Sequence, residues 1–315
     1  MKYIFGPVKS RRLGLSLGVD IIPYKTCSFN CIYCECGHTT NKTMERKAWV
    51  NSDDVLDEIS TFLKTYSKKI DYITFSGSGE PTLHSDLGKI IERIKKITDI
   101  PVAVLTNSSL MHLPEVRESL NKADLVVPSL DAVSDTVFKK IDRPLDGISV
   151  EQIVDSLVLF KRSYKGQMWL EILFVEGLNT EKEEIEKLKE VIKKIKPDRV
   201  QLNTVDRTPL YEWVKPVSFE KLLEISKILD FPYTDIVSSR EPLKERQGKE
   251  HPSSFEREEI ILNLIKESPL STEEISERLN MGINSVERTL HGLITKKKIK
   301  RIEINGKVIY ELNIY

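Results

Sequence analysis

The sequence predicts an α/β fold in which parallel strands are covered by helices, followed by a smaller second domain. Over residues 1–235, six apolar strand patterns alternate with helical patterns, an order typical of a parallel sheet with helices outside. Residues 236–254 are polar and contain two prolines, which indicates a linker. Residues 255–315 change to three helical patterns and an alternating hairpin.

Bulk composition is that of a soluble globular protein, with 40% hydrophobic and 30% charged residues in 315. Forty-eight basic residues balance forty-eight acidic ones, so any case for a polyanionic partner must come from local charge. The N-terminal segment has no apolar signal-peptide region, and no stretch approaches the ~20 apolar residues of a membrane span. We therefore expect a cytoplasmic protein with no membrane partner.

Each strand and helix of the first domain has its own local pattern. Strands are expected at residues 17–23, 71–76, 101–107, 123–131, 168–177 and 198–205. Helices are expected at residues 52–66, 86–97, 114–121, 134–140, 149–164, 180–195 and 218–229. The first of these helices begins with Ser52 and two aspartates, which are typical of a helix N-terminus.

All four cysteines lie in one loop after the first expected strand, in the spacing Cys27-x3-Cys31-x2-Cys34 with Cys36 beyond. Disulfides are a poor explanation, because such short loops gain little and cytoplasmic thiols stay reduced. Zinc or a mixed redox role remains an alternative, although structural zinc sites usually use two separated pairs. Three thiolates on one loop fit an iron–sulfur cubane with one iron left open.

The residues between the cysteines suit a cluster, since Phe29, Ile32 and Tyr33 can shield it from water. Cys36 is extra to the spacing. We expect it to be a spectator thiol; the alternatives are a fourth ligand when no cofactor is bound, or a group facing the substrate.

The three-cysteine spacing, with Tyr33 just before the third cysteine, resembles the signature of the radical S-adenosylmethionine (SAM) superfamily. The resemblance implies a partial (βα)6 barrel over residues 1–235, a [4Fe-4S] cluster on the three cysteines, and SAM on the open iron. It implies that one electron cleaves SAM to methionine and a 5′-deoxyadenosyl radical, which takes a hydrogen atom from the substrate. A ferredoxin- or flavodoxin-like reductant is implied as a partner.

The segment "SGSGEPT", residues 76–82, follows the second strand and resembles the superfamily's Gly-Gly-Glu segment. The resemblance implies that Gly77, Gly79 and Glu80 contact SAM, with Glu80 near its amino group. Ser78 replaces the usual first glycine. Glycines at this point let the backbone approach a ligand closely.

Further cofactor contacts are expected where later strands end, since barrel chemistry lies at the carboxyl ends of strands. Asn107 ends the third strand, and Ser129 and Asp131 end the fourth. The alternative for each is a turn or a helix cap. Glu171 and Asn203 lie within strands at which related enzymes touch the nucleoside.

Three cations in "KSRRLG", residues 9–14, precede the first strand. A solvated turn is the simpler interpretation, and an anion site for a substrate phosphate or carboxylate is the alternative. The five histidines form no ligand-spaced pair, and we interpret them as structural or surface residues.

The C-terminal domain has the order helix, helix, turn, helix, hairpin, which predicts a winged helix–turn–helix. Ser271 and Glu274 form a capping-box pattern, and Asn305-Gly306 is typical of a hairpin turn. Its charge is polarised, with seven basic residues and one glutamate over 288–307. The expected nucleic-acid or partner contacts are Arg288, Lys296, Lys297, Lys298, Lys300 and Arg301. Docking of a peptide or protein, or packing alone, remains an alternative.

Segments such as "SRRLGLSLGVD", "FSGSGEPTLH", "IDRPLDGIS" and "VQLNTVDR" resemble the wyosine-synthetase group over residues 3–235. This chain lacks the three additional N-terminal cysteines of those enzymes. The leading hypothesis is a radical SAM enzyme that modifies RNA, with a tRNA-like substrate. The alternatives are a radical SAM enzyme for a peptide or protein substrate, and a DNA-binding iron–sulfur redox sensor.

Overall fold

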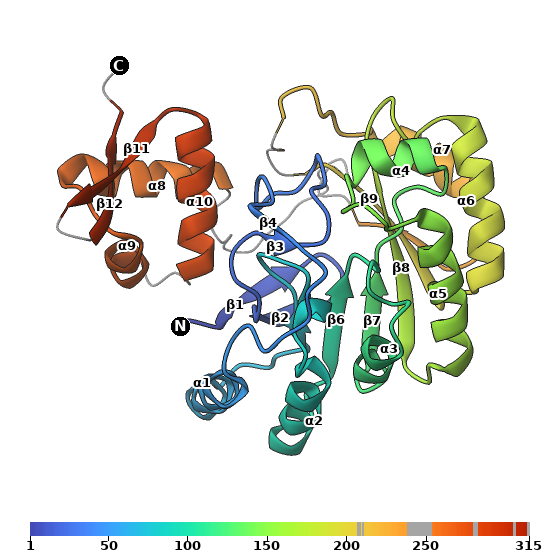
Figure 1. Cartoon of the computed structure of the whole chain (residues 1–315), viewed down its shortest axis with the longest axis horizontal. Helices are drawn as coiled ribbons and strands as arrows, with labels where there is room; N and C mark the ends of the chain where they lie inside the picture. The colour runs from blue at the N-terminus through green and yellow to red at the C-terminus, as the bar shows by residue number, and fades with distance from the viewer. Residues whose placement is uncertain (207–208, 210, 238–253, 280–282, 305–306, 314–315) are drawn as a thin grey trace.

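The computed structural model describes all residues except 207–208, 210, 238–253, 280–282, 305–306 and 314–315. Its main body is built on one sheet (Figure 1). In spatial order the strands are β1 (Ile4–Ser10), β2 (Gly14–Val19), β5 (Tyr72–Phe75), β6 (Val102–Thr106), β7 (Leu125–Pro128), β8 (Gln167–Phe174), β9 (Arg199–Thr204) and β10 (Thr234–Ile236). Within this sheet the described strands from β2 to β10 run parallel, and the β1–β2 pair is antiparallel. The predicted α/β fold is confirmed.

Seven helices connect these strands and cover the outside of the sheet (Figure 1). They are α1 (Ser52–Thr65), α2 (Leu87–Ile97), α3 (Pro114–Leu120), α4 (Asp135–Ile141), α5 (Val150–Ser163), α6 (Lys182–Ile195) and α7 (Phe219–Leu229). The cap of α1 is Asn51, whose side chain accepts from the amides of Asp53 and Asp54. Ser52 is thus the first helical residue. Among the described residues, no helix is long and apolar enough to cross a membrane.

Alternation along β8 shows which face of the sheet packs against the helices and which faces the inside of the barrel. Met168, Leu170, Ile172 and Phe174 are fully buried and join the apolar core between sheet and helices. The residues between them are less buried and face the other side. Because side chains alternate along a strand, Glu171 belongs to the inner face of the curved sheet.

The first strand pair differs from the sequence prediction. A strand was expected at 17–23, but β2 ends at Val19 and an unpredicted strand, β1, precedes it. The carboxylate of Asp20 accepts from the amides of Ile22 and Ser78, which turns the chain out of the sheet into the cysteine loop.

The C-terminal unit, residues 254–313, has its own apolar core. It consists of α8 (Ser254–Glu267), α9 (Thr272–Leu279), α10 (Ile283–Thr295), β11 (Ile299–Ile304) and β12 (Lys307–Leu312). Among the described residues, its buried apolar side chains are Ile261, Ile265, Leu270, Ile275, Val286, Leu290, Leu293 and Ile299. The capping box is confirmed: Ser271 N donates to Glu274 and Glu274 N donates to Ser271. The expected Asn305-Gly306 turn and most of the expected linker lie outside the described residues.

Helix α10 is the part of this unit that faces the barrel (Figure 1). The rings of His291 and Tyr24 lie 6.2 Å apart between centroids. A Cβ atom on Gly37 would come within 2.8 Å of His291 Nδ1. The unit therefore touches the loop that carries the cysteines.

Candidate functional site

The cysteine loop runs from β2 to α1 and contains two short paired strands, β3 (Thr26–Cys27) and β4 (Asn41–Lys42). Cys27, Cys31 and Cys34 are half-buried, whereas Cys36 is 3% exposed. Two backbone turns follow Cys31, since Cys34 N donates to Cys31 O and Gly37 N donates to Cys34 O.

Each of the three predicted ligands has a polar neighbour at its sulfur. Lys25 Nζ lies 3.2 Å from Cys34 Sγ, although Lys25 is only 2% exposed. Asn107 Nδ2 lies 3.4 Å from Cys27 Sγ. Cys31 Sγ lies 3.4 Å from Asp142 Oδ1.

These neighbours give the three thiols different acidities. Burial raises the pKa of Cys27 to about 12 and raises the pKa of Cys31 well above its usual value. The hydrogen bond from Cys36, together with the charge of Lys25, lowers the pKa of Cys34 to about 5 despite burial. Burial lowers the pKa of Lys25, but the nearby thiolates raise it more, so it stays charged.

The donor set is compatible with a cluster. No group of three His, Cys, Asp or Glu side chains in the described part of the chain is placed to hold a single metal ion. A cubane differs, because each cysteine binds a different iron and the sulfurs stand wider apart. A buried lysine beside three thiols supplies a positive charge that offsets the negative charge of such a group.

The glycine–glutamate segment lies directly against the cysteine loop. Gly77 has φ +143°, and a Cβ there would come within 2.4 Å of the Asp20 carboxylate. A Cβ on Gly79 would come within 2.2 Å of Thr26 O. Lys25 N donates to Ser78 O. The absence of side chains at both glycines therefore permits this close approach.

Glu80 is 2% exposed and fixes Asn107. Its carboxylate accepts from Thr106 Oγ1 at 2.7 Å, from Asn107 N at 2.7 Å, and from the amide and hydroxyl of Thr82. Burial raises the pKa of Glu80, although these hydrogen bonds oppose the shift. Because Asn107 in turn reaches Cys27, the structure brings together three of the residues predicted from the sequence.

Asp131 and Ser129 also face the cysteine loop. The Asp131 carboxylate accepts from Leu173 N and from the hydroxyl of Tyr33. Burial raises the pKa of Asp131 to about 6. A cavity of about 10 Å³, enough for roughly one water molecule, joins these residues. Its lining comprises Phe29, Tyr33, Asn107, Ser129, Leu130, Asp131, Phe138, Asp142 and Ile153.

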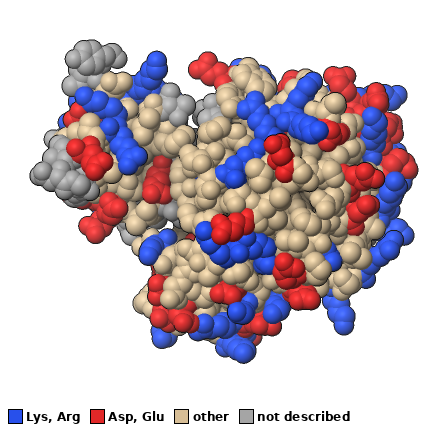
Figure 2. Space-filling model, viewed as in Figure 1, with Lys and Arg blue, Asp and Glu red and all other residues tan. Residues whose placement is uncertain are grey.

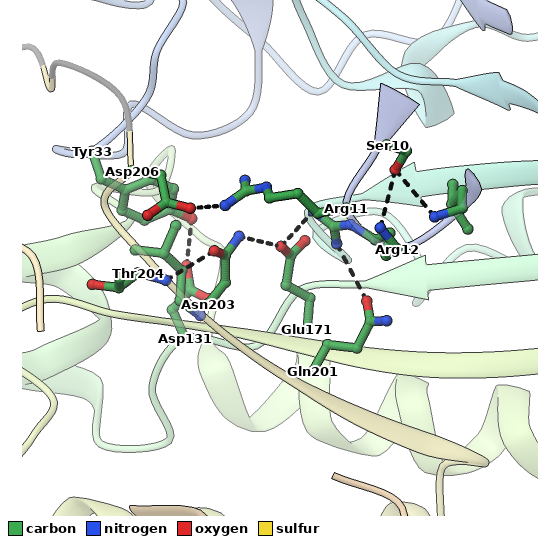
Figure 3. Close-up of polar contacts among 12 residues, drawn as sticks. Ser10, Arg11, Arg12, Tyr33, Asp131, Glu171, Gln201, Asn203, Thr204 and Asp206 are labelled. Carbon is green, nitrogen blue, oxygen red and sulfur yellow. Dashed lines mark hydrogen bonds and ion pairs between the residues drawn. The ribbon is translucent and has the colours of Figure 1, made fainter. Parts of the chain in front are cut away.

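Arg11 and Arg12 reach carboxylates across the barrel, whereas Lys9 is exposed. The interpretation of this segment as a solvated turn is therefore wrong for Arg12. Its side chain is 12% exposed and lies 2.8 Å from Glu171. Figure 3 shows Arg12 also reaching Gln201, and Arg11 reaching Asp206. Asn203 donates to the same Glu171 carboxylate at 2.9 Å. Both arginines thus have carboxylate partners from the far side of the sheet.

Burial alone would raise the pKa of Glu171, but Arg12, the hydrogen bond from Asn203 and the charge of Arg11 together hold it below its usual value. The network in Figure 3 therefore carries charges of both signs inside the barrel. It ties the β1–β2 turn to β8 and β9.

The basic residues predicted in the C-terminal unit have mixed environments. Lys296 pairs with Glu258, and Lys300 pairs with Glu311. Lys297, Lys298 and Arg301 are exposed. The side chain of Arg288 lies outside the described residues.

Sequence reasoning missed two residues at the cysteine sulfurs, Lys25 and Asp142. Each had a signal. Lys25 stands two residues before Cys27, and Asp142 lies in "IDRPLDGIS", a segment already singled out by its resemblance. Neither position has a sequence feature that predicts burial of a charge.

Residues 21–192 match the radical SAM superfamily. A UPF0026 protein of Methanocaldococcus jannaschii is 34% identical over 317 residues, which are 100% of this chain and 97% of that protein. The chain belongs to the radical SAM superfamily and to the UPF0026 family. As a radical SAM enzyme it uses a [4Fe-4S] cluster and SAM.

Two further relatives match this radical SAM enzyme over part of their own length. A Brachyspira hyodysenteriae protein named GTPase Obg is 40% identical over 313 residues, but the match spans only 45% of that longer protein. A probable dual-specificity RNA methyltransferase RlmN of Thermotoga petrophila is 27% identical over 212 residues, 64% of this chain and 58% of that one.

Solved structures share the fold at low sequence identity. Streptococcus suis SuiB bound to SAM has a TM-score of 0.54 and 14% identity, covering 70% of this chain and 50% of that one. A radical SAM methyltransferase of Sphaerobacter thermophilus has a TM-score of 0.51 and 15% identity, covering 72% and 67%.

Proposed function

We propose that this radical SAM enzyme modifies an RNA. The observation that carries the proposal is the relation to the Thermotoga RNA methyltransferase, which extends over 64% of the chain. Exposed Lys297, Lys298 and Arg301 support it, because such cations bind phosphates without reading sequence. A tRNA-like substrate and membership of the wyosine-synthetase-like group remain predictions.

We propose that Cys27, Cys31 and Cys34 hold the cluster, which when bound supplies the electron that cleaves SAM. Asn107 orients Cys27, and Lys25 compensates the charge at Cys34. Glu80 positions Asn107 and lies beside the glycines that let SAM approach. Gly77, Gly79, Ser129 and Asp131 complete the SAM contacts in this proposal. A ferredoxin- or flavodoxin-like protein would supply the electron, and the site of action would be the cytoplasm.

We also propose that residues 255–315 form a winged helix–turn–helix domain, that residues 236–254 link it to the barrel over residues 1–235, and that it docks the RNA. The order of α8, α9, α10, β11 and β12 around a separate apolar core supports this. Lys296 and Lys300 contribute less than predicted, because each has an acidic partner within the unit.

The test is release of 5′-deoxyadenosine by anaerobically reconstituted, reduced protein, with and without bulk tRNA or total RNA. A rise that RNase removes supports an RNA substrate. The double variant K297Q/K298Q should lose much of the rise at physiological salt, whereas K64Q/K68Q, exposed lysines at the end of α1 and beyond it, should keep it. Release that RNA never changes contradicts the proposal.

A second candidate, a peptide or protein substrate, is favoured by one observation. On one side of the hairpin, β12 bonds to the backbone of Leu270 through Tyr310. Within the described residues, β11 pairs only with β12, so its outer edge can accept an extended peptide. RNase-insensitive stimulation by a peptide fraction would favour this candidate. The DNA-binding redox sensor is the least supported alternative, since the chain is a radical SAM enzyme.

A further inference from the structure

The loop after β9 presents an exposed aromatic stack. The rings of Tyr211 and Trp213 lie 5.7 Å apart between centroids with an interplanar angle of 27°. Trp213 is 54% exposed. The other two tryptophans are less exposed and stack against cations of their own chain, Lys47 on Trp49 and Arg199 on Trp169. Trp213 therefore offers a ring face to a partner.

Arg143 completes this stack. Its Nη1 donates to the Tyr211 hydroxyl at 2.7 Å, and its guanidinium lies 4.8 Å from the Tyr211 ring centroid. Arg143 has φ +46°, at the turn that follows α4. The three side chains form one surface, which we name the aromatic platform: Arg143, Tyr211 and Trp213.

The aromatic platform is fixed to the cysteine loop. Tyr211 packs in an apolar cluster with Ile32 and Val214, both almost fully buried. Ile32 N also donates to Ile141 O, at the end of α4. Ile32 lies between the cluster ligands Cys31 and Cys34, so the platform stands at the edge of the reaction site.

Several cations lie near the aromatic platform, together with exposed Glu212, which separates Tyr211 from Trp213 in the chain. Figure 2 shows Lys and Arg side chains on this face of the molecule, with Asp and Glu side chains among them. Exposed Lys140 lies in the last turn of α4, and its exposed neighbour Lys139 pairs with Asp135. Exposed Lys42 donates to Pro144 O, one residue beyond Arg143. Stacked rings flanked by cations are the combination that single-stranded nucleic acids require: a face for a base and charges for its phosphates.

We propose that the aromatic platform stacks an unpaired base of the RNA substrate, with Trp213 as the exposed ring, and so holds a single-stranded segment beside the cluster. This inference rests on the proposed RNA substrate and names the structural class of RNA that the site accepts. Arg143 contributes through its planar guanidinium, which can stack on a base or contact a phosphate.

The test measures binding of the full-length, reconstituted protein to a 12-nucleotide oligoadenylate and to a matched RNA duplex. Trp213→Ala should weaken oligoadenylate binding about tenfold, and Trp213→Phe should restore most of it. The slope of affinity against salt should stay unchanged in W213A, because stacking releases no counterions. Tyr233→Ala, a 62% exposed aromatic beyond α7, is the matched control and should bind like the wild type.

The outcomes separate this inference from the proposed function. If W213A binds oligoadenylate as the wild type does, or loses duplex and single strand equally, the aromatic platform is refuted even when RNA stimulates SAM cleavage. If W213A loses single-strand binding but no RNA stimulates cleavage, the platform stands and the RNA-modifying reaction fails. Weaker binding of a tryptic peptide pool, with oligoadenylate binding intact, would overturn the inference in favour of a peptide surface.

Discussion

Lys25 is a buried charge placed among thiols. A lysine that is 2% exposed is costly unless an opposite charge compensates it. Here the compensation comes from the cysteines, with Cys34 Sγ at 3.2 Å. Because Lys25 lies this close to Cys34, its positive charge stabilises negative charge on the cysteines and on a group that they bind.

We expect Lys25→Met to shift the midpoint potential of the reconstituted cluster to more negative values. The reduced cluster carries one more negative charge, and a buried cation stabilises that state. An EPR-monitored redox titration measures the shift. Lys42→Met, an exposed lysine on the neighbouring β4, is the control and should keep the wild-type potential. An unaltered potential in K25M would assign Lys25 to folding alone.

Gly79 is a point where two loops approach each other closely. A methyl group there would meet Thr26 O at 2.2 Å and Ile22 Cγ2 at 2.4 Å. We expect Gly79→Ala to lower the free energy of unfolding by about 1–3 kcal/mol and to reduce SAM binding to the reconstituted protein.

Urea unfolding and equilibrium dialysis measure these two effects of Gly79→Ala. Gly292→Ala is the comparison, because a Cβ there meets only Glu258 Oε1 at 3.8 Å. That helix-interior change should stabilise α10 by up to about 1 kcal/mol. Wild-type stability in G79A would show that the two loops can separate freely.

At the scale of elements, the side chain of Arg12 ties the β1–β2 turn to the inner face of the barrel. Its partner Glu171 has a side chain that is 13% exposed and a pKa below its usual value. A lowered folded-state pKa stabilises the fold above the unfolded carboxyl pKa, about 4.3. That contribution is lost as the pH falls through the lower folded value.

We expect Arg12→Met to cost up to about 3–5 kcal/mol of unfolding free energy at pH 7, because it leaves the mostly buried Glu171 charge without its cation partner, with Asn203 still donating to it. The loss should shrink toward pH 4, where Glu171 in the variant takes up a proton. Urea unfolding at several pH values measures it. Lys9→Met, an exposed cation in β1, should cost far less. A loss in R12M that does not vary with pH would separate Arg12 from Glu171.

At the scale of the whole molecule, the C-terminal unit meets the barrel through His291. Burial lowers the pKa of His291, and the charges of Lys25 and His38 lower it further. An undocked histidine takes up a proton near pH 6.5, whereas the docked ring does so only at lower pH. Docking therefore weakens as the pH falls below about 6.5.

We expect His291→Ala to speed amide hydrogen exchange over residues 24–37 at pH 7.5, because the ring no longer covers Tyr24 and Gly37. At pH 5.5 the wild type should approach the variant. Comparing the two proteins at each pH cancels the intrinsic exchange rates. Tyr233→Ala, which removes an exposed aromatic just after α7, should leave this segment unchanged. Equal exchange in H291A and the wild type at pH 7.5 would contradict docking through this ring.

Much of the site was predictable because its residues follow strands in chain order. Cys27, Glu80, Asn107 and Asp131 each come just after an apolar run, and parallel strands bring such positions to one edge. Arg12 was not predictable in the same way. Its burial depends on which strands lie across the barrel from the β1–β2 turn. The sequence did not predict β1, so it could not predict this turn.

The aromatic platform shows the same limit. Arg143 and Tyr211 lie 68 positions apart, and no local pattern relates them. Their contact follows from the ends of α4 and β9 meeting in space. Lys25 differs again: it is local to the cysteines, but a lysine in a loop is usually exposed.

The contact between α10 and the cysteine loop has a consequence for biosynthesis. The ribosome completes the cysteine loop roughly 250 residues before it reaches His291. At about 5–20 residues per second, the loop waits on the order of ten to fifty seconds before its cover exists. Iron and sulfide can be delivered to the nascent chain during that interval, so slowing translation of the last quarter of the message should raise the fraction of protein that acquires its cluster.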